Sequence, residues 1–490
     1  MASTTSRRSF LIGLAAGAAV VGFDPLSRSW VTEADAADAT TVLDVPPLDG
    51  ELLTDAASRD AAADDFGHIV HRRPFAVLRP GSVDDIVTMV RFANAHLIHV
   101  AARGQGHSTF GQPQVEDGLV IDMSTLSAVH HVGTDRAVVD GGAVWSSLLT
   151  SALAQGRTPP VLTDYIELSV GGTLSVGGIG GTTHRHGLQV DNVLELQVVT
   201  GEGQLVTCSP HRHRRLFDAV LAGLGQSALI VRATVRLVPA AEQARTYLLS
   251  YVDLATFTAD QRRLVTEERF DYVEGQVLPG AGGGWTFLLE AATFYTPPDV
   301  PDDARLLDGL RYEPGSEQIV DQSLFDFQNR LAPAVEFLKS IGVWFHPHPW
   351  LNLFLPGSRA DGYLADVFAE LTPDDLGGGP ILLYPFLRAR LTKPLARVPD
   401  EPVVFLLGLL RTAPPDDPQV VDEMITGNRD LFEQARRIGG KQYPIGSIPF
   451  SRSDWARHFA PEFGRLAAAK ALDDPRRILT PGQGIFPTRG

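Results

Sequence analysis

Apolar positions in the first part of the chain change between helical spacing and short β-branched runs. After Ser82, a good N-terminal cap, Ile86, Val90 and Ala93 recur at the spacing of one helix face. A strand is predicted from His99 to Ala102, directly before a glycine-rich loop. Short strands are also predicted in GLVIDMS (118–124), LSAVHHV (126–132) and RAVVDGG (136–142). This alternation predicts a domain that mixes helices with sheets.

Two longer segments extend this pattern. VLELQVVTGEGQLVTCS (193–209) places two β-branched runs around Gly-Glu-Gly, which predicts a hairpin. LFDAVLAGLGQSALIVRATVRLVP (216–239) predicts a helix over 216–222 and a strand over 228–237. Its glycines loosely match the dinucleotide fingerprint, but that motif needs a strand before it and a helix after it. The order here is reversed, which excludes a Rossmann domain.

The chain is too long for one hydrophobic core, because 490 residues exceed the usual limit for a single domain. The character changes near residue 243, where strands and helices begin to alternate between glycine- and proline-rich loops. Residues 41–65 are acidic and alanine-rich, so we expect them on the surface. We expect four parts: a leader (1–39), a first domain (40–242), a second α+β domain (243–430) and a C-terminal segment (431–490) that rejoins the first domain.

The leader resembles an export signal. Arg7 and Arg8 precede an apolar stretch from Phe10 to Phe23, and the small-residue run 33–39 offers a cleavage zone. The S-R-R-x-F-L pattern resembles a twin-arginine signal, which exports folded proteins, and an ordinary secretory signal is the alternative. The apolar stretch is short for a membrane span, and we expect none elsewhere. The predicted location is therefore outside the cytoplasm, periplasmic or extracellular.

Composition narrows the class of ligand. Hydrophobic residues make up 44% and charged residues 20% of the chain, and the formal net charge is −16. A nucleic-acid partner is excluded because it needs a basic surface, so we expect a small-molecule substrate. Cys208 is the only cysteine, which excludes an intrachain disulfide and a cysteine-rich metal site. The histidines of HRHRR (211–215) are expected to be solvated and those of FHPHPW (345–350) structural, so no metal is predicted.

Two glycine-rich loops are candidate ligand sites. RGQGHSTFGQ (103–112) sets His107 among three glycines, which would let backbone N–H groups approach a ligand and present the imidazole to it. The alternative is a turn with an incidental polar residue. LTDYIELSVGGTLSVGGIGGTTHRHG (162–187) has seven glycines and a run of hydroxyl side chains, which can wrap a pyrophosphate. The alternative is a glycine-rich surface loop.

With these motifs in order along the chain, the sequence resembles the cytokinin dehydrogenases, flavoproteins of the vanillyl-alcohol-oxidase class. The G-H-S element marks only the flavoprotein class, whereas HPWLN (348–352) and the pair TDY (163–165) and YVEG (272–275) are typical of the narrower family. Other stretches that carry the resemblance are RHGLQVDNVLELQVVTGEGQLVTCS (185–209), LFDAVLAGLGQ (216–226), GPILLYPF (379–386), RSDWARHF (452–459) and LTPGQGIF (479–486).

The resemblance implies a two-domain α+β fold with a PCMH-type FAD-binding domain and an α+β substrate-binding domain. It also implies that FAD is bonded covalently through its 8α-methyl group to His107. Because Cys208 lies in the predicted hairpin, a second, thioether tether is not expected. The residues that the resemblance assigns to FAD binding are Arg103, Gly104, Gln105, Gly106, His107, Ser108, Gln112, Asp164, Ser169, Ser175, Ile179, Leu229, Thr480 and Gln483.

The resemblance makes Asp164 the catalytic base beside the flavin, with Glu274 close to it. A carboxylate that accepts the N6–H of an N6-substituted adenine would orient the carbon that loses hydride. Two close carboxylates cannot both ionise cheaply, so one pKa is expected to rise. The alternatives are a helix or turn cap for Asp164 and an exposed strand residue for Glu274. The chain departs from family members at Leu162, where Trp is usual, and at Ala334, where some have Glu.

The implied activity is FAD-dependent oxidative cleavage of N6-isoprenoid adenines, the cytokinins, to adenine and an unsaturated aldehyde. A quinone-like acceptor or O₂ would reoxidise the flavin, and a monomer is expected. One alternative keeps the scaffold and oxidises a sugar, an alcohol or a secondary metabolite. Another is a non-catalytic protein that holds a purine.

Overall fold

The computed structural model describes residues 20–24, 29–32, 43–280 and 283–488. Most of the predicted leader, with Arg7 and Arg8, lies outside the described residues, so the export signal stays a prediction. In the part of the leader that is described, β1 (Val20–Asp24) pairs with β2 (Ser29–Thr32). The strand β1 also pairs with β3 (Leu43–Asp44), which follows the leader.

A four-stranded sheet begins the first domain, and β6 leads directly into the first glycine loop. In sheet order the strands are β4 (Glu51–Leu53), β5 (Ala76–Arg79), β7 (Leu119–Asp122) and β6 (Val100–Arg103). Helix α2 (Val83–His96) joins β5 to β6, and the hydroxyl of Ser82 accepts a hydrogen bond from Asp85 N at 3.3 Å. The predicted apolar face, including Ile86 and Val90, is buried against this sheet.

A five-stranded sheet completes the first domain. In sheet order its strands are β12 (Leu205–Cys208), β11 (Val193–Thr200), β13 (Ala228–Arg236), β9 (Arg136–Asp140) and β8 (Val129–Val132). The predicted hairpin is confirmed, since β11 and β12 pair antiparallel with Val199 opposite Leu205. Helix α6 (Arg214–Val220) precedes β13, which is the reversed order that excludes a Rossmann motif.

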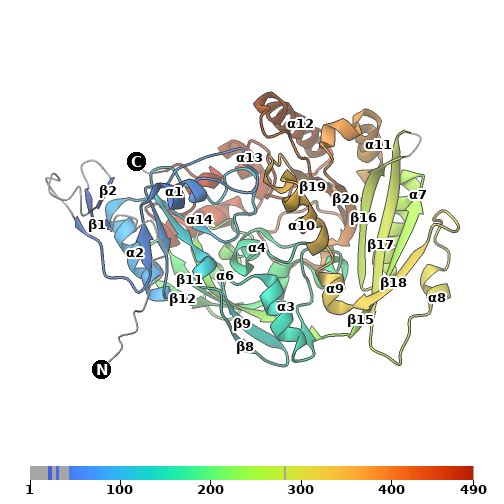
Figure 1. The fold of residues 1–490 in the computed structure, drawn as a ribbon, viewed down its shortest axis with the longest axis horizontal. Coiled ribbons are helices and arrows are strands. Elements are labelled where there is room, and N and C mark those ends of the chain that lie inside the picture. Colours follow the sequence, from blue (N-terminus) through green and yellow to red (C-terminus); the bar gives the residue numbers. More distant parts are fainter. Residues whose placement is uncertain (1–19, 25–28, 33–42, 281–282, 489–490) are drawn as a thin grey trace, which may run out of the picture.

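An eight-stranded sheet forms the second domain. In sheet order its strands are β18 (Gln318–Ser323), β15 (Gln243–Tyr251), β17 (Trp285–Tyr295), β16 (Tyr272–Pro279), β20 (Ile381–Leu387), β21 (Val403–Leu409), β19 (Leu351–Pro356) and β22 (Lys441–Gln442). Helices α7 (Leu254–Glu267), α11 (Ala360–Glu370) and α12 (Pro418–Arg437) share a hydrophobic core with one face of this sheet (Figure 1). Its other face packs on the first domain, where Phe354 and Tyr384 join the core of Leu174 and Leu188. This arrangement confirms the expected two-domain α+β fold.

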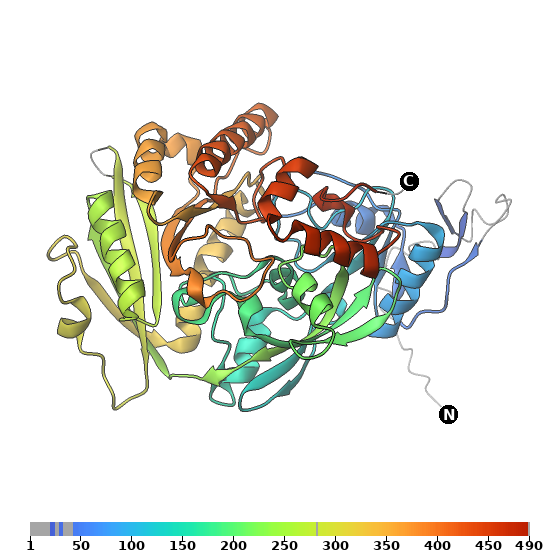
Figure 2. The same ribbon diagram turned by 180° about the vertical axis from the view of Figure 1, so that it is seen from behind.

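The boundary expected at residue 430 falls inside a helix. Helix α12 runs across it without a break, and β22 then pairs with β19, so the second domain extends to Gln442. Beyond it, α13 (Arg452–Phe459) and α14 (Phe463–Asp473) lie against the first domain (Figure 2). Leu479 makes a parallel bridge with Val100, which brings the tail beside β6.

The expected surface position of residues 41–65 is wrong in part. Helix α1 (Ala56–Ala62) ends in buried residues, and Asp65 after it is 2% exposed. The Asp65 carboxylate accepts hydrogen bonds from Gly67 N and Gly111 N at 3.1 and 2.7 Å. An acidic residue is buried here because it satisfies backbone N–H groups of two loops.

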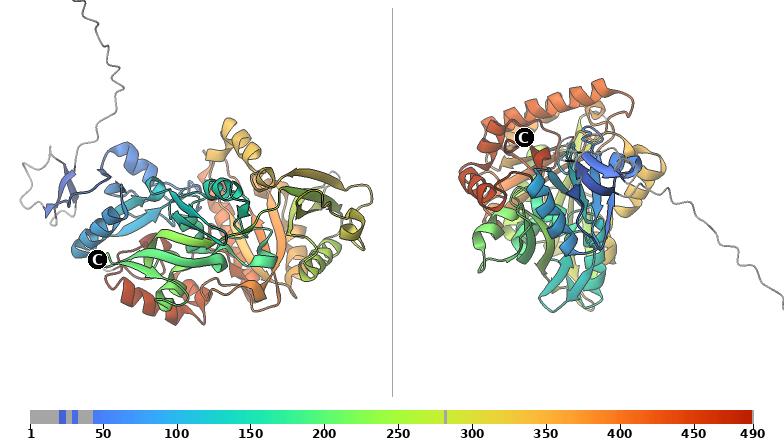
Figure 3. Two further views of the ribbon diagram at one scale, coloured as in Figure 1. Left: turned by 90° about the horizontal axis from the view of Figure 1, so that it is seen from below. Right: turned by 90° about the vertical axis from the view of Figure 1, so that its left-hand side faces the viewer.

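The remaining elements are short. The two-stranded pair β10 (Arg157–Thr158) and β14 (Val238–Pro239) lies where the chain leaves the first domain. The remaining helices are α3 (Trp145–Leu153), α4 (Val170–Val176), α5 (Thr183–His186), α8 (Asp303–Leu307), α9 (Leu324–Gln328) and α10 (Ala332–Ser340). The domains lie side by side along the longest axis (Figure 3). Among the described residues, no helix combines the length and the hydropathy that a membrane crossing needs.

Candidate active site

The first glycine loop is held in place by the segment before β5. Gly106 and Gly111 have φ values of +64° and +74°, which favour glycine. Phe66 N donates to Gly106 O at 2.8 Å, and Asp65 holds Gly111 as described above. Burial raises the pKa of Asp65 to about 7. The loop is therefore bound to residues 65–67 by backbone and carboxylate hydrogen bonds.

The side chain of Arg103 packs against the backbone of the first glycine loop. A Cβ atom at Gly106 would lie 2.4 Å from Nη2 of Arg103, so only glycine fits at this point. The guanidinium also donates a hydrogen bond to the carbonyl of Asp64. Gln105, in contrast, is exposed, and the carbonyl of Ser108 accepts a hydrogen bond from Gly67 N at 3.3 Å.

The two glycine loops meet at Gly104 and Ser169. A Cβ at Gly104 would lie 1.9 Å from Oγ of Ser169. Ser169 is the N-cap of α4, yet its hydroxyl makes no capping hydrogen bond. Gly171 N donates to Gly141 O at 2.7 Å, and a Cβ at Gly171 would lie 2.9 Å from that oxygen. Added side chains would fill this narrow backbone cradle.

Three other residues assigned to the cofactor by resemblance have contacts inside the first domain. Oγ of Ser175 donates to Gly171 O at 2.7 Å inside α4. The side chain of Ile179 is 7% exposed and packs in the core of the first domain. Leu229 is 3% exposed and lies in a separate cluster with Val100 and Leu479, so a cofactor contact here would come from its backbone.

The C-terminal tail brings two more of these residues to the first domain. Thr480 N donates to Val100 O at 2.8 Å, and Thr480 Oγ1 donates to Gly225 O at 2.9 Å. Gly225 has a φ of +68°, and a Cβ there would meet Thr480 Oγ1 at 2.8 Å. The tail therefore lies close to β6, from which the first glycine loop begins.

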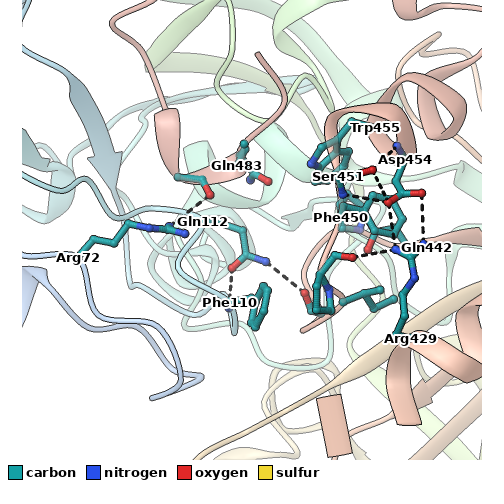
Figure 4. A pocket seen from close by; sticks show the side chains of 16 residues that line it. Arg72, Phe110, Gln112, Arg429, Gln442, Phe450, Ser451, Asp454, Trp455 and Gln483 are labelled. Carbon is teal, nitrogen blue, oxygen red and sulfur yellow. Dashed lines mark hydrogen bonds and ion pairs between the residues drawn. The ribbon is translucent and has the colours of Figure 1, made fainter. Parts of the chain in front are cut away.

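A pocket of about 600 Å³ lies between the first glycine loop and the C-terminal segment (Figure 4). Gln112 and Gln483 line it, and Nε2 of Gln112 donates to Gly446 O at 3.3 Å. Another part of the wall carries Arg429 and Asp454, which are joined by a 3.1 Å ion pair. His107 and Asp164, two candidate site residues, are not among the residues that line this pocket.

His107 lies among aromatic rings from several parts of the chain. Its ring centroid is 4.1 Å from that of Phe66, 5.0 Å from Tyr165, 5.7 Å from Trp344 and 5.6 Å from Trp350. Burial and the neighbouring His348 lower the pKa of His107 to about 3. The imidazole is therefore neutral at ordinary pH, with an unprotonated ring nitrogen.

Asp164 reaches from the first domain into the second. Its Oδ1 accepts a hydrogen bond from the Tyr272 hydroxyl at 2.9 Å and one from Arg330 Nη2 at 2.8 Å. Within the described residues, its Oδ2 has no hydrogen-bond partner. The N-cap of the helix that follows is Ser169, so the alternative of Asp164 as a helix cap is wrong.

Glu274 lies on β16 and faces the first domain. The alternative of an exposed strand residue is wrong, since Glu274 is 3% exposed. A Cβ at Gly181 would meet its Cγ at 2.8 Å, so the second glycine loop packs directly on this carboxyl group. Burial, and then the charge of Asp164, raise the pKa of Glu274 well above its ordinary value. Its Oε1 is buried without a hydrogen-bond partner among the described residues.

Sequence reasoning missed four residues of this site. Tyr272 shares the strand face of Glu274, a signal that the two-residue spacing could have given. Glu290 of β17 lies directly opposite Glu274, and Arg330 comes from the turn between α9 and α10. Tyr443 accepts a hydrogen bond from Gly178 N at 3.0 Å. The last three contacts depend on strand register and domain packing, which no local pattern reveals.

Among the described residues, no group of three or more histidine, cysteine, aspartate or glutamate side chains could hold a metal ion. His348, in the FHPHPW segment, stacks on Phe66 with ring centroids 4.2 Å apart. Its Nε2 lies 3.2 Å from the carbonyl of Trp344, and burial lowers its pKa to about 4. These contacts give it a structural role in the wall around His107.

Comparison with known families gives two matches that together span both domains. A model described as "Cytokinin dehydrogenase 1, FAD and cytokinin binding" matches residues 279–486, and an "FAD binding domain" model matches residues 74–209. Cytokinin dehydrogenase 10 of Oryza sativa subsp. japonica is 39% identical, over 91% of this chain and 91% of that protein. Cytokinin dehydrogenase 2 of Arabidopsis thaliana is 36% identical, over 91% of this chain and 95% of that protein.

A bacterial relative is similar over almost its whole length. The uncharacterized oxidoreductase ORF5 in the fasciation locus of Rhodococcoides fascians is 42% identical, over 89% of this chain and 99% of that protein. Among solved structures, 6-hydroxy-D-nicotine oxidase of Arthrobacter nicotinovorans has a TM-score of 0.69 at 20% identity, over 88% of this chain and 96% of that one. A VAO-type flavoprotein of Myceliophthora thermophila has a TM-score of 0.68 at 17% identity, over 85% and 80%. These two structures support the fold alone.

Proposed function

This chain belongs to the cytokinin dehydrogenase family and is an FAD-dependent oxidoreductase, and from that premise we propose that it cleaves N6-isoprenoid adenines oxidatively. The products are adenine and an unsaturated aldehyde. The observation that carries this proposal is the position of Asp164, one residue before the Tyr165 ring that packs on His107. A carboxylate with one unbonded oxygen thus directly precedes the ring that packs on the residue that we assign to the cofactor.

The substrate amine fits this carboxylate. Tyr272 and Arg330 hold Oδ1 of Asp164, which leaves Oδ2 to accept the N6–H of the substrate. FAD supplies the acceptor for the hydride that leaves the carbon bonded to N6. Asp164 takes the N6 proton, so the C–N single bond becomes C=N, and addition of water then separates adenine from the aldehyde. Positioned acid–base groups of this kind typically contribute about 10²–10⁴-fold in rate.

The backbone around the two glycine loops fits an FAD pyrophosphate. At Gly104 and Gly171 the absence of a Cβ lets the backbone of the two loops pack closely, as a pyrophosphate-binding backbone requires. The hydroxyl of Ser169 is not used in capping and lies at the same place. The pocket between Gln112 and Gln483 offers further space for the cofactor. The candidate residues therefore suit a large phosphorylated ligand.

We assign the covalent FAD attachment to His107. Its neutral imidazole offers a ring nitrogen that can form a bond to the 8α-methyl group, and the surrounding rings fix its orientation. Cys208 is buried on β12, outside both glycine loops, so it is not part of our attachment scheme.

The remaining parts of the proposal concern the setting of the enzyme. The leader with Arg7 and Arg8 would export the folded holoenzyme by the twin-arginine route. A quinone-like molecule or O₂ would reoxidise the flavin, and the enzyme would act as a monomer. Covalent attachment would prevent loss of FAD outside the cell.

Anaerobic titration of the purified yellow protein with isopentenyladenine tests the proposal. We expect the flavin absorbance to bleach and adenine to appear in a stoichiometric amount. Bleaching by a sugar, an alcohol or another metabolite, but not by isopentenyladenine, would favour the other oxidase function. A protein that binds purines but bleaches with none of these compounds would contradict the catalytic role.

A further inference from the structure

One guanidinium group lies among three carboxyl groups at the interface between the domains. Nη2 of Arg330 lies 2.8 Å from Asp164 and 3.7 Å from Glu274, while its Nε lies 2.9 Å from Glu290. The side chains of Glu274 and Glu290 are only 4% and 9% exposed. If all three carboxyl groups were ionised, the cluster would carry two uncompensated buried charges, which is very costly.

The strand register increases the repulsion between two of these carboxyl groups. Glu274 and Glu290 are directly opposite each other on the neighbouring strands β16 and β17. Like charges at such a pair are destabilising, so either a cation or a proton must separate them. Arg330 forms its close ion pair with Glu290, and Glu274 is the more distant carboxylate. A proton is therefore needed mainly on Glu274.

The surroundings of Glu274 agree with a bound proton. Its Oε1 is buried with no partner within the described part of the chain, which is unfavourable for an ionised oxygen. Burial and the Asp164 charge both raise its pKa. Other groups that face the cluster are Tyr272 on the same strand and Tyr384 on β20, and burial raises the pKa of each phenol well above its ordinary value. Neither phenol supplies a second negative charge near neutral pH.

We propose that Arg330 is a positioning residue that holds Oδ1 of Asp164 and aims its Oδ2 at the substrate, while Glu274 carries the proton that the cluster requires. This inference rests on the proposed function for the identity of the substrate, but the protonation of Glu274 does not. Arg330 and Tyr272 both bind Oδ1 of Asp164, and the ring of Tyr272 lies 4.9 Å beneath the guanidinium carbon. Rotation of the carboxylate is thereby restricted to one orientation.

The arrangement exists only when the domains are joined. Asp164 comes from the first domain, whereas Arg330, Glu274 and Glu290 come from the second. A carboxylate in the first domain therefore acquires its orientation from a cation in the second. Substitution of Arg330 should affect the reaction through Asp164 rather than through direct contact with the substrate.

Infrared spectroscopy of the substrate-free holoenzyme tests the protonation state. We expect the carbonyl band of a buried protonated carboxylic acid at pH 7. The intensity of this band should fall in Glu274→Gln and not in Asp164→Asn, because the buried Asp65, with a pKa of about 7, contributes equally in all three proteins. An unchanged band in Glu274→Gln, or a fall in Asp164→Asn alone, would overturn the assignment to Glu274. This measurement needs no substrate, so its result stands even if isopentenyladenine fails to bleach the flavin.

The pH profile of flavin reduction by isopentenyladenine tests the role of Arg330. Arg330→Lys should slow reduction about 10- to 100-fold with little change in the substrate dissociation constant, because it removes a charge-assisted hydrogen bond from Asp164. A less well-placed cation offsets the negative charge of the carboxyl cluster less, so the acidic limb of the reduction rate should move to higher pH. Glu290→Gln removes a competing anion and should move that limb to lower pH.

The acidic limb should move in opposite directions in Arg330→Lys and Glu290→Gln, and this difference distinguishes a positioning role of Arg330 from a merely structural one. Loss of packing alone would lower the amount of folded holoenzyme without moving the two limbs apart. Limbs that stay fixed, or that move in the same direction, would overturn the proposal. If Arg330→Lys does not fold, Glu290→Gln still decides, because an unmoved acidic limb in that variant would contradict the shared charge.

Discussion

The ring of Tyr165 packs against the ring of His107, with 5.0 Å between their centroids. This contact joins the two glycine-rich loops, which are separated along the sequence by residues 113–161. It also sets the position of Asp164, whose backbone is bonded to that of Tyr165. The candidate base and the candidate attachment residue are therefore fixed relative to each other by one aromatic contact.

Asp164→Asn should slow flavin reduction by isopentenyladenine about 10²–10⁴-fold, because the amide cannot accept the N6 proton. Substrate binding should weaken much less, since the interaction is realised mainly in the transition state. Single-turnover bleaching and a binding titration separate the two effects. Glu167→Gln, an exposed carboxylate in the same loop, is the matched control. An Asp164→Asn enzyme with the wild-type bleaching rate would remove Asp164 from the mechanism.

His107→Ala should yield protein with FAD that is weakly held or absent. The reason is that the attachment proposed here depends on one imidazole nitrogen. Acid precipitation is the measurement: the yellow colour of the wild type should stay in the pellet, and any colour of the variant should pass into the supernatant. His211→Ala, which changes an exposed histidine, should behave like the wild type. Wild-type colour released by acid would refute covalent attachment.

Gly104→Ala should lower the FAD content, because its Cβ would lie 1.9 Å from Oγ of Ser169 and disturb the contact between the two loops. The double variant Gly104→Ala/Ser169→Gly removes both side-chain atoms that obstruct the new methyl group and should recover part of the loss. Gly362→Ala is the control, since nothing lies within 4 Å of its added Cβ. The flavin-to-protein absorbance ratio measures each outcome. Equal ratios in Gly104→Ala and the control would contradict the cradle.

His458 should make the fold sensitive to acid. Burial, followed by the charges of Lys441 and Arg397, lowers its pKa to about 3 from an ordinary value of 6.5. The unfolded chain therefore binds a proton more readily than the folded chain. The contribution of His458 to the free energy of unfolding is fully present above pH 6.5 and is lost as the pH decreases toward 3. The loss from pH 6.5 to 4.5 is about 2–3 kcal/mol for this group.

His458→Phe tests that assignment, because phenylalanine has a similar shape and cannot bind a proton. Its ring would retain the contacts with Trp455 and Phe459. Thermal unfolding at pH 7 and at pH 4.5 should show a smaller decrease for the variant than for the wild type. An identical decrease in both proteins would assign the acid sensitivity to other groups.

Replacement of Arg7 and Arg8 by lysine should retain the folded, FAD-loaded protein in the cytoplasm, because the twin-arginine route requires the arginine pair. Fractionation of cells, followed by measurement of flavin in each fraction, would detect the block. A variant that is exported as well as the wild type would indicate the ordinary secretory route instead.

The sequence by itself determined the local elements and the two glycine loops. Helix α2 begins after Ser82, the 193–209 hairpin forms, and the helix before Ala228 is followed by a strand, because caps, turns and hydrophobic spacing act over a few residues. Glycines at positions 104 and 106 likewise indicated that other groups approach the loop backbone closely. In the structure, neighbouring side-chain atoms leave no room for a Cβ at either position. The family resemblance was visible for the same reason, since its motifs are short and continuous.

Tertiary structure alone decided how the carboxyl groups of the site are paired. Glu290 opposes Glu274 only through the register of β16 and β17, and Arg330 meets Asp164 across 166 residues of sequence. Burial also decided that Glu274 is an interior residue, and an unbroken α12 decided that the second domain continues past residue 430. Charge and burial at such points depend on the separation of atoms in space, because electrostatic energies follow distance and local dielectric rather than spacing along the chain.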